Sequence, residues 1–249
     1  MSRIDDLVRF YDLLYHLEQV LGGARTLANL SDYRDWPERG VYLFFEPDEA
    51  RRESGEGPRV VRVGTHALGA GSRSTLRQRL GQHRGKVSGG GNHRGSIFRL
   101  LVGQALLAQG ELASCKSWGV KGDAGRASVA LDMDRGELAA TEEPVERAVS
   151  RRLGTMTFLW LNIGDEPGPG SLRGAIERNA IALLSNHGRA PLDPPSPSWL
   201  GHASDRPLVR GSGLWNQRHV EEAYDPAFLD TLEILIAGRG RTNDRVLRR

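Results

Sequence analysis

Hydrophobic residues recur at helical spacing over residues 4–21, which predicts an N-terminal helix that the glycine pair at 22–23 ends. The run from Gly40 to Phe45 is apolar and aromatic and has the length of a strand, and the run from Val60 to Gly64 predicts a second strand. A charged loop at 46–59 separates the two runs. Two strands joined in this way most simply form an antiparallel hairpin.

The next segment predicts a short helix over about 74–83. Ser72 or Ser74 is a suitable N-cap, and Leu76 and Leu80 would face the core. Further elements follow from the same criteria. They are helices at 97–108 and 141–152, a strand at 157–163 buried on both faces, a Ser171-capped helix to about Asn186 with Gly188 at its end, and a last helix at 226–237, whereas 112–140 is polar and irregular.

The basic residues are concentrated in one part of the chain. The formal net charge is only +3, but the segment from Ala67 to Gly110 contains no Asp or Glu. Its cationic residues, apart from two histidines, are Arg73, Arg77, Arg79, Arg84, Lys86, Arg94 and Arg99. Such a segment suits a polyanion, because basic clusters that contact a nucleic-acid backbone release its counterions. The alternative is a solvated basic face.

The composition excludes several other classes of protein. The single cysteine, Cys115, allows no internal disulfide and cannot build a zinc site by itself. No apolar run approaches the ~18 to 20 residues that a membrane helix needs, and the N-terminus shows no signal-peptide pattern. We therefore expect a cytoplasmic protein.

Short motifs along the chain stand in an order that resembles the GIY-YIG nuclease family. They are Gly40-Val41-Tyr42 on the first strand, Arg62-Val63-Gly64 on the second, the helix segment Leu76–His83 with Arg79, and Ile176-Glu177-Arg178-Asn179 on a later helix. The matching elements cover about 40–100 and 157–190. The second motif of the family normally begins with tyrosine, a position that Arg62 fills here. Some restriction-type members also have a basic residue there.

The resemblance implies an α+β fold in which a small, mostly antiparallel central sheet is flanked by helices. The 249 residues would form a single domain. Its parts would be a core at about 38–110 and 155–195, an N-terminal helix at 3–22, an insertion at about 110–152 and a C-terminal extension at 196–249.

The resemblance also implies a metal-dependent endonuclease that hydrolyses DNA phosphodiester bonds, with Mg²⁺ or Mn²⁺ as its cofactor. Glu177 would bind the metal, since Mg²⁺ keeps most of its waters and needs only one or two protein carboxylates. RNA stays open as a substrate, and restriction-type relatives make a homodimer plausible. Two other functions also stay open: an inactive nucleic-acid-binding module on the same fold, and a protein-interaction or regulatory subunit.

The resemblance assigns roles to the strand and helix residues. Tyr42 lies between Val41 and Leu43, so it points to the opposite face of the sheet. It would act as a general base or position the attacking water, which requires cationic neighbours because tyrosine ordinarily has a pKa near ~10. Arg79 would grip the scissile phosphate. His83 would relay a proton from Tyr42 or form a hydrogen bond to it.

Arg62 lies between Val61 and Val63, so we expect its side chain to face away from both. It would replace the second motif's tyrosine as a phosphate or water ligand, because a guanidinium stays charged and is a poor base. For the family's late asparagine, the first candidate is Asn186, and the alternatives are Asp193 and Asn216. The residues expected to contact the nucleic-acid backbone are Arg73, Arg77, Arg84, Lys86 and Arg94.

Overall fold

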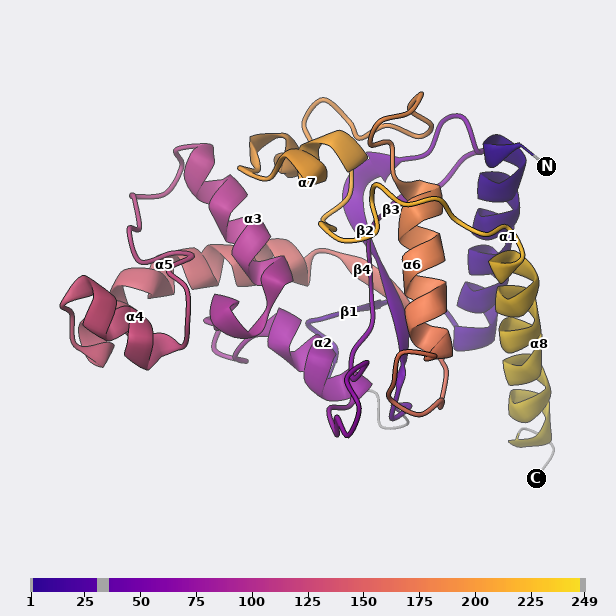
Figure 1. Cartoon of the computed structure of the whole chain (residues 1–249), viewed down its shortest axis with the longest axis horizontal. Coiled ribbons are helices and arrows are strands. Elements are labelled where there is room, and N and C mark those ends of the chain that lie inside the picture. The colour runs from indigo at the N-terminus through magenta and orange to yellow at the C-terminus, as the bar shows by residue number, and fades with distance from the viewer. Residues whose placement is uncertain (1, 31–35, 247–249) are drawn as a thin grey trace.

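A computed structural model describes residues 2–30 and 36–246 of the chain (Figure 1). The strands are β1 (Arg25–Thr26), β2 (Gly40–Ala50), β3 (Pro58–Gly64) and β4 (Thr157–Asn162). The helices are α1 (Arg3–Leu21), α2 (Leu76–Arg84), α3 (Ile97–Ala108), α4 (Ala124–Leu131), α5 (Arg135–Gly154), α6 (Leu172–Leu184), α7 (Pro207–Ser212) and α8 (Phe228–Val246), with short 3-10 turns η1 (His93–Gly95) and η2 (Leu200–Ala203). None of the helices in the described ranges combines the length and the hydrophobicity that a bilayer crossing requires.

The sheet is open and antiparallel, with the strand order β1-β4-β2-β3, which confirms the predicted α+β class. Strand β2 lies inside the sheet, so that Tyr42 stands opposite Gly64 on one neighbour and Trp160 on the other. The predicted hairpin is confirmed, but its arms are longer than expected. Strand β2 continues through Ala50 and β3 begins at Pro58, both inside the segment predicted as a loop.

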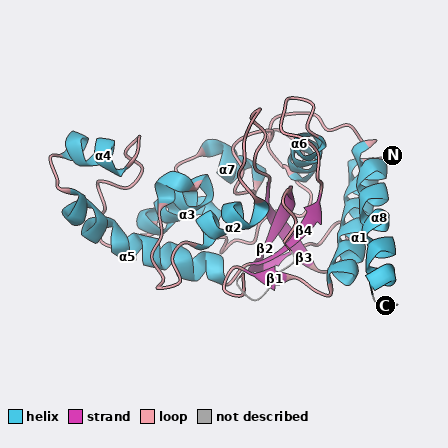
Figure 2. Cartoon of the chain, turned by 90° about the horizontal axis from the view of Figure 1, so that it is seen from below, coloured by secondary structure: helices cyan, strands magenta, loops and turns pink. Residues whose placement is uncertain are grey.

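Helices cover both faces of the sheet, while α4 and the start of α5 extend away from it (Figure 2). Helices α1, α6 and α8 pack with Val41 and Leu43 in one core, and α2, α3 and α5 pack with Tyr42 and Phe44 in the other. This is the alternation that an extended strand imposes on successive side chains. It confirms that Tyr42 points away from Val41 and Leu43.

A β-bulge in β3 changes the direction of its side chains. Arg62 pairs with Phe44, but the register shifts beyond this pair and leaves Val61 without a partner on β2. Val61 lies in the same core as Phe44, whereas Val63 lies in the core on the other face. The expectation that Arg62 faces away from both valines is therefore right for Val63 and wrong for Val61. The extra residue of a bulge interrupts the alternation of the strand.

Helices α1, α2, α3 and α6 begin within two residues of their predicted starts. The N-cap of α2 is Thr75, whose hydroxyl accepts a backbone N–H of the first turn at 3.2 Å, and not Ser72 or Ser74 as expected. Helix α6 ends at Leu184, before the expected Asn186, because Ser185 has extended backbone angles.

The segment predicted to be irregular contains helix α4 and the first turns of α5. Ala127 is the one residue that α4 buries, so no apolar stripe marks this helix in the sequence. Helix α5 begins at Arg135, where Asp134 forms a capping box with Glu137, and it continues through Pro144. The expected start at residue 141 was wrong because the first turns of α5 bury little apolar surface.

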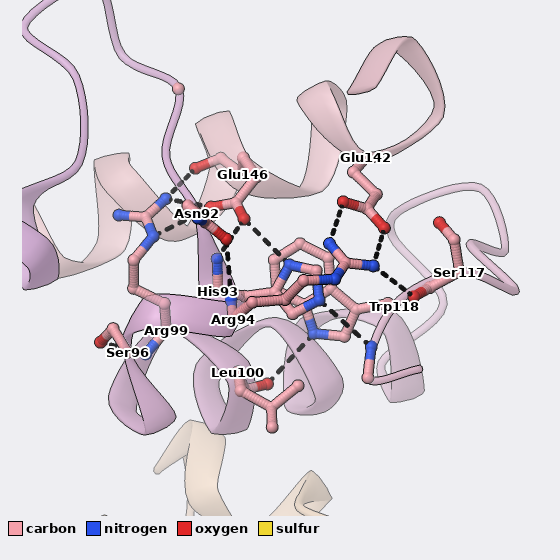
Figure 3. Close-up of polar contacts among 12 residues, drawn as sticks. Asn92, His93, Arg94, Ser96, Arg99, Leu100, Ser117, Trp118, Glu142 and Glu146 are labelled. Atoms are coloured by element: carbon pink, nitrogen blue, oxygen red, sulfur yellow. Dashed lines mark hydrogen bonds and ion pairs between the residues drawn. The ribbon is translucent and has the colours of Figure 1, made fainter. Parts of the chain in front are cut away.

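Helix α5 supplies the counterions for part of the basic segment (Figure 3). The buried guanidinium of Arg99 donates to Glu146 at 2.5 and 2.9 Å, and Arg94 donates to both carboxylate oxygens of Glu142 at 2.6 and 2.7 Å. Glu146 also accepts the backbone N–H of His93 at 2.6 Å. These contacts fix helix α5 to helix α3 and to the turn η1 that precedes it.

Candidate active site

A cleft of about 890 Å³ opens beside the β2–β3 hairpin, between helices α2, α3 and α6 and the segment 215–219. The predicted catalytic residues that line it are Tyr42, Arg62, Arg79 and Glu177. His83 lies behind Tyr42, and its Nε2 is 2.8 Å from the Tyr42 hydroxyl. The structure thus brings these five side chains together from two strands and two helices.

The position of Tyr42 depends on a glycine in the neighbouring strand. Gly64 stands opposite Tyr42 in the ladder, and a Cβ on Gly64 would lie 2.5 Å from both Cζ and the hydroxyl oxygen of Tyr42. The phenol therefore crosses the β3 backbone at a place where only glycine leaves room. Phe44 packs edge-on against the same ring, with 5.7 Å between the ring centroids. Together these contacts hold the buried phenol at the wall of the cleft.

Tyr42 is the first member of a buried chain of hydrogen bonds. His83 Nε2 lies 2.8 Å from the Tyr42 hydroxyl, and His83 Nδ1 lies 2.8 Å from Ser96 Oγ. Ser96 is also the N-cap of α3, where its hydroxyl accepts the N–H of Arg99. Burial, and then the charge of Arg79, lower the pKa of His83 well below its usual range. The imidazole is therefore neutral and donates from only one of its two nitrogens.

Arg62 supplies a buried positive charge beside Tyr42. Its guanidinium lies 4.7 Å from the centroid of the Phe98 ring and donates to the Trp215 carbonyl. Burial lowers the pKa of Arg62, whereas Tyr42 and Glu177 act in the opposite direction. A guanidinium keeps its charge even when buried. Arg62 Nε has no hydrogen-bond partner in the described part of the chain, so this cation has an unused donor near the cleft.

Glu177 is the only carboxylate among the described residues that line the cleft. Helix α6 presents it half-buried toward β3, where its Oε1 accepts the N–H of Thr65 at 3.1 Å. Burial raises the pKa of this carboxyl group, and Arg62 is the largest opposing influence. No described residue donates a hydrogen bond to its second oxygen, which leaves that oxygen for a ligand.

Glu177 is suited to a divalent cation that takes few of its ligands from the protein. In the ranges that the structure describes, no group of three or more His, Cys, Asp or Glu residues could enclose a metal. Mg²⁺ commonly keeps several waters and binds through one or two carboxylates. The free oxygen of a carboxylate in an open cleft is suited to that mode of binding.

Arg79 lies on α2 and faces the cleft half-buried. Its Nη1 donates to Gln82 Oε1 at 2.9 Å and to the Gly95 carbonyl at 3.1 Å. Neither partner is anionic, and within the described residues Arg79 forms no ion pair. Its other N–H groups are therefore available to a phosphate, with which a guanidinium can form two parallel hydrogen bonds.

The candidates for the late polar position lie in different places. Asn186 lies outside the cleft, and its Oδ1 accepts from Arg3 at 3.0 Å and from the N–H of Leu192 at 2.9 Å. Asp193 also lies outside the cleft and accepts backbone N–H groups of the β2–β3 loop. Asn216 lines the cleft, and its amide binds the N–H and the C=O of one β3 residue at 3.1 and 2.8 Å. Geometry therefore favours Asn216 over Asn186.

The residues expected to contact a nucleic-acid backbone divide into three groups. Arg73 and Arg77 are exposed. Arg84 and Lys86 line a second hollow, on another face of α2. The side chain of Arg94 is only 8% exposed and is held by a carboxylate of α5, so its charge is already paired within the protein (Figure 3).

Sequence reasoning missed the wall of the cleft formed by residues 217–219. This segment follows Trp215, whose N–H donates to the carbonyl of Val61 at 2.7 Å. The exposed side chain of Arg218 adds a further cation to the cleft. The sequence offers only an apolar-to-polar junction at 214–216, which does not indicate the strand that it contacts.

The comparisons with known proteins agree with this geometry. A family model described as a GIY-YIG domain matches residues 1–241. No curated protein and no solved structure shows a significant match to the chain. Proteins with this domain are generally nucleases, and the match spans nearly the whole sequence of 249 residues. The chain therefore belongs to the GIY-YIG domain family.

Proposed function

We propose that this protein is a single-domain endonuclease that hydrolyses DNA phosphodiester bonds in the cleft with the help of Mg²⁺ or Mn²⁺. The observation that carries the proposal is the convergence of Tyr42, His83, Arg62, Arg79 and Glu177 on one cleft. Phosphodiester hydrolysis needs an activated water, cations for the phosphoryl oxygens and help for the leaving oxygen. The side chains that meet in the cleft supply groups for each of these requirements.

The scissile phosphate binds between Arg62 and Arg79. Both guanidinium groups line the cleft, and both retain N–H groups that no described residue accepts. Negative charge that develops on the phosphoryl oxygens strengthens these contacts in the transition state, and this difference accelerates the reaction. Arg62 stands where the family's second motif normally has tyrosine, and its role there is to bind phosphate and not to act as a base.

As a phenolate, Tyr42 accepts the proton of the attacking water; as a neutral phenol, it positions that water. His83 acts as a hydrogen-bond donor and not as a store for the proton, because burial and the neighbouring cations lower its pKa. When the Ser96 hydroxyl donates to Nδ1, the Nε2–H of His83 donates to the Tyr42 oxygen and stabilises negative charge there. The buried charge of Arg62 acts in the same direction.

Glu177 holds the metal ion through the oxygen that Thr65 does not bind. When bound, a divalent ion neutralises charge on the phosphoryl oxygens and assists the leaving oxygen. Asn216 takes the late polar position and acts indirectly. Both ends of its amide bind Val63, and these bonds hold the segment 215–219 against β3.

Nicking of supercoiled DNA in the presence of Mg²⁺ or Mn²⁺ tests the proposal. We expect nicking by the wild type and a loss of at least about 10²-fold for Glu177→Gln, which keeps the size of the side chain and leaves DNA binding intact. The matched control is Glu166→Gln, because Glu166 is 86% exposed and lies outside the cleft. A wild type that does not nick, or a Glu177→Gln variant that nicks undiminished, would overturn the catalytic assignment.

An inactive nucleic-acid-binding module on the same fold is the second candidate. The presence of Arg62 in place of the second motif's tyrosine favours it. It predicts that the wild type binds DNA at low salt without nicking it. Failure to bind DNA or RNA at low salt would instead favour a protein-interaction or regulatory role.

A further inference from the structure

A second hollow lies on another face of α2 from the cleft. It has a volume of about 460 Å³ and is enclosed by the C-terminal end of α2, the loop that follows and the second half of α5. Its lining combines four basic side chains with small and apolar residues and one serine, Ser150, and none of these residues also lines the cleft.

The hollow has more basic side chains than acidic side chains around it. Arg84, Lys86, Arg147 and Arg151 line it, and no carboxylate is among the described lining residues. Arg147 is paired with Glu143 at 2.9 Å. The other three cations form no ion pair within the described residues, and the Nε of Arg84 is buried there without a hydrogen-bond partner. A bound anion would supply the counterion that these cations lack and an acceptor for the unpaired N–H group of Arg84.

An exposed valine stands at the rim of the hollow. Val87 is 89% exposed at the tip of a tight turn. The turn is closed by hydrogen bonds from the N–H of Lys86 to the Gly90 carbonyl at 2.7 Å and from the N–H of Gly89 to the Lys86 carbonyl at 3.0 Å. Gly89 has a φ of 103°, which favours glycine. With Val87 at its rim, the hollow presents both charge and apolar surface to a ligand.

A helix end by itself does not explain these features. Helices α2 and α5 both end near the hollow, and the carbonyl groups of a helix C-terminus favour nearby cations. This effect accounts for the presence of Arg84 and Arg151. It does not account for the exposure of Val87.

Helix α2 connects the hollow with the cleft. Arg79 lines the cleft, and Arg84 lines the hollow. Arg77 is exposed and lies seven residues before Arg84, so the two lie on the same face of the helix, roughly 10 Å apart along its axis. A nucleic-acid strand that leaves the cleft can therefore follow α2 to the hollow.

We propose that the hollow binds a backbone phosphate of the DNA strand outside the cleavage site, with Val87 packed against the adjoining sugar. The inference rests on the proposed function, because it takes DNA as the ligand. It gives the insertion a part in substrate binding, since α5 contributes Arg147 and Arg151.

Binding of a fluorescently labelled duplex in EDTA tests the inference without cleavage. For the double variant Lys86→Gln/Arg151→Gln we expect Kd to rise about 10-fold and the slope of log K against log salt to fall by about 1. Val87→Glu changes an exposed side chain, so it is expected to fold normally and to weaken binding as well. The matched control is Lys116→Gln/Lys121→Gln, which removes the same charge from exposed positions that line neither the cleft nor the hollow.

Equal affinities of the wild type and the Lys86→Gln/Arg151→Gln variant overturn the inference, as does an equal loss in the control variant. It is also overturned if inorganic phosphate stabilises the wild type but not the variant while both bind DNA equally, because the hollow would then be a site for a free anion. If the wild type fails to nick DNA but the expected loss of affinity is observed, the nuclease proposal falls and the binding site stands.

Discussion

Tyr42 and Gly64 face each other across the β2–β3 ladder, and the phenol of Tyr42 occupies the space that a side chain at position 64 would need. The glycine of the second motif and the tyrosine of the first are therefore two parts of one contact. This contact sets the Tyr42 hydroxyl 2.8 Å from His83 Nε2.

Gly64→Ala is predicted to abolish most of the cleavage and to leave DNA affinity unchanged. The added Cβ displaces the phenol, and a displacement of ~1 Å in a catalytic group can cost about 10²-fold in rate. We also expect a loss of about 1–3 kcal/mol in the free energy of unfolding, from overpacking. Single-turnover cleavage and urea denaturation measure the two effects. Gly81→Ala is the control, because nothing lies within 4 Å of its added Cβ; a wild-type rate for Gly64→Ala would contradict the contact.

Replacement of Arg62 is predicted to reduce kcat/KM without abolishing DNA binding. Arg62→Gln removes the buried charge, and we expect a loss of about 10²–10³-fold, typical of one transition-state donor. Arg62→Lys keeps the charge but loses the planar contact with Phe98, so an intermediate rate is expected. Steady-state cleavage of a short duplex measures both. An Arg62→Gln variant as active as the wild type would remove Arg62 from the phosphate site.

Glu146→Ala is predicted to destabilise the fold by about 3–5 kcal/mol, because it leaves a buried cation without its partner. That cation is Arg99, which is fully buried on α3. Urea denaturation measures the change. The control is Glu143→Ala on the same helix, whose half-exposed pair with Arg147 is expected to contribute at most about 1 kcal/mol. Similar losses in the two variants would show that the Arg99–Glu146 pair does not anchor α5 to α3.

The stability of the fold is predicted to fall as the pH drops below about 6.5, where histidines of the unfolded chain gain protons. In the folded protein, burial and then Arg173 lower the pKa of His66 to about 4, and the pKa of His83 is also lowered. The unfolded state therefore binds protons that the folded state does not. Each group contributes stability that is complete above its unfolded pKa and is lost as the pH falls toward the folded value.

This pH dependence is tested by urea denaturation at about pH 7.5 and pH 5.5, between which each histidine is expected to cost about 1.4 kcal/mol. His66→Gln removes one of the two groups. The variant should therefore lose about 1.4 kcal/mol less than the wild type over the same interval. An identical loss in both proteins would show that His66 does not titrate on unfolding in this range.

The helices and strands with a regular hydrophobic pattern were predictable from the sequence, because their buried residues recur at the spacing of a helix or a strand. Helical spacing located α1 and α3, and two strand-like runs located the hairpin that carries Tyr42. Arg79 and His83 are four residues apart, a spacing that puts neighbouring side chains on one side of a helix such as α2. Glu177 joined them only through the family resemblance, since a single glutamate on a helix carries no local signal.

The remaining features depend on contacts between distant segments. The bulge at Val61 depends on a register shift between two strands, which strand alternation does not reveal. Arg94 was expected at a nucleic-acid surface, but Glu142, 48 residues later, pairs with it. Asn216 reaches β3 from 153 residues away. Neither distant partner is indicated by the local sequence.

The segment after Trp215 also protects an edge of the sheet. Trp215 satisfies the carbonyl of Val61, and the Asn216 amide satisfies both backbone groups of Val63. An uncovered strand edge is a template on which a second chain can pair and aggregate. At β3 such pairing would first have to displace a wall of the cleft. A second chain that paired with this part of the edge would therefore open the wall of the cleft that residues 215–219 form.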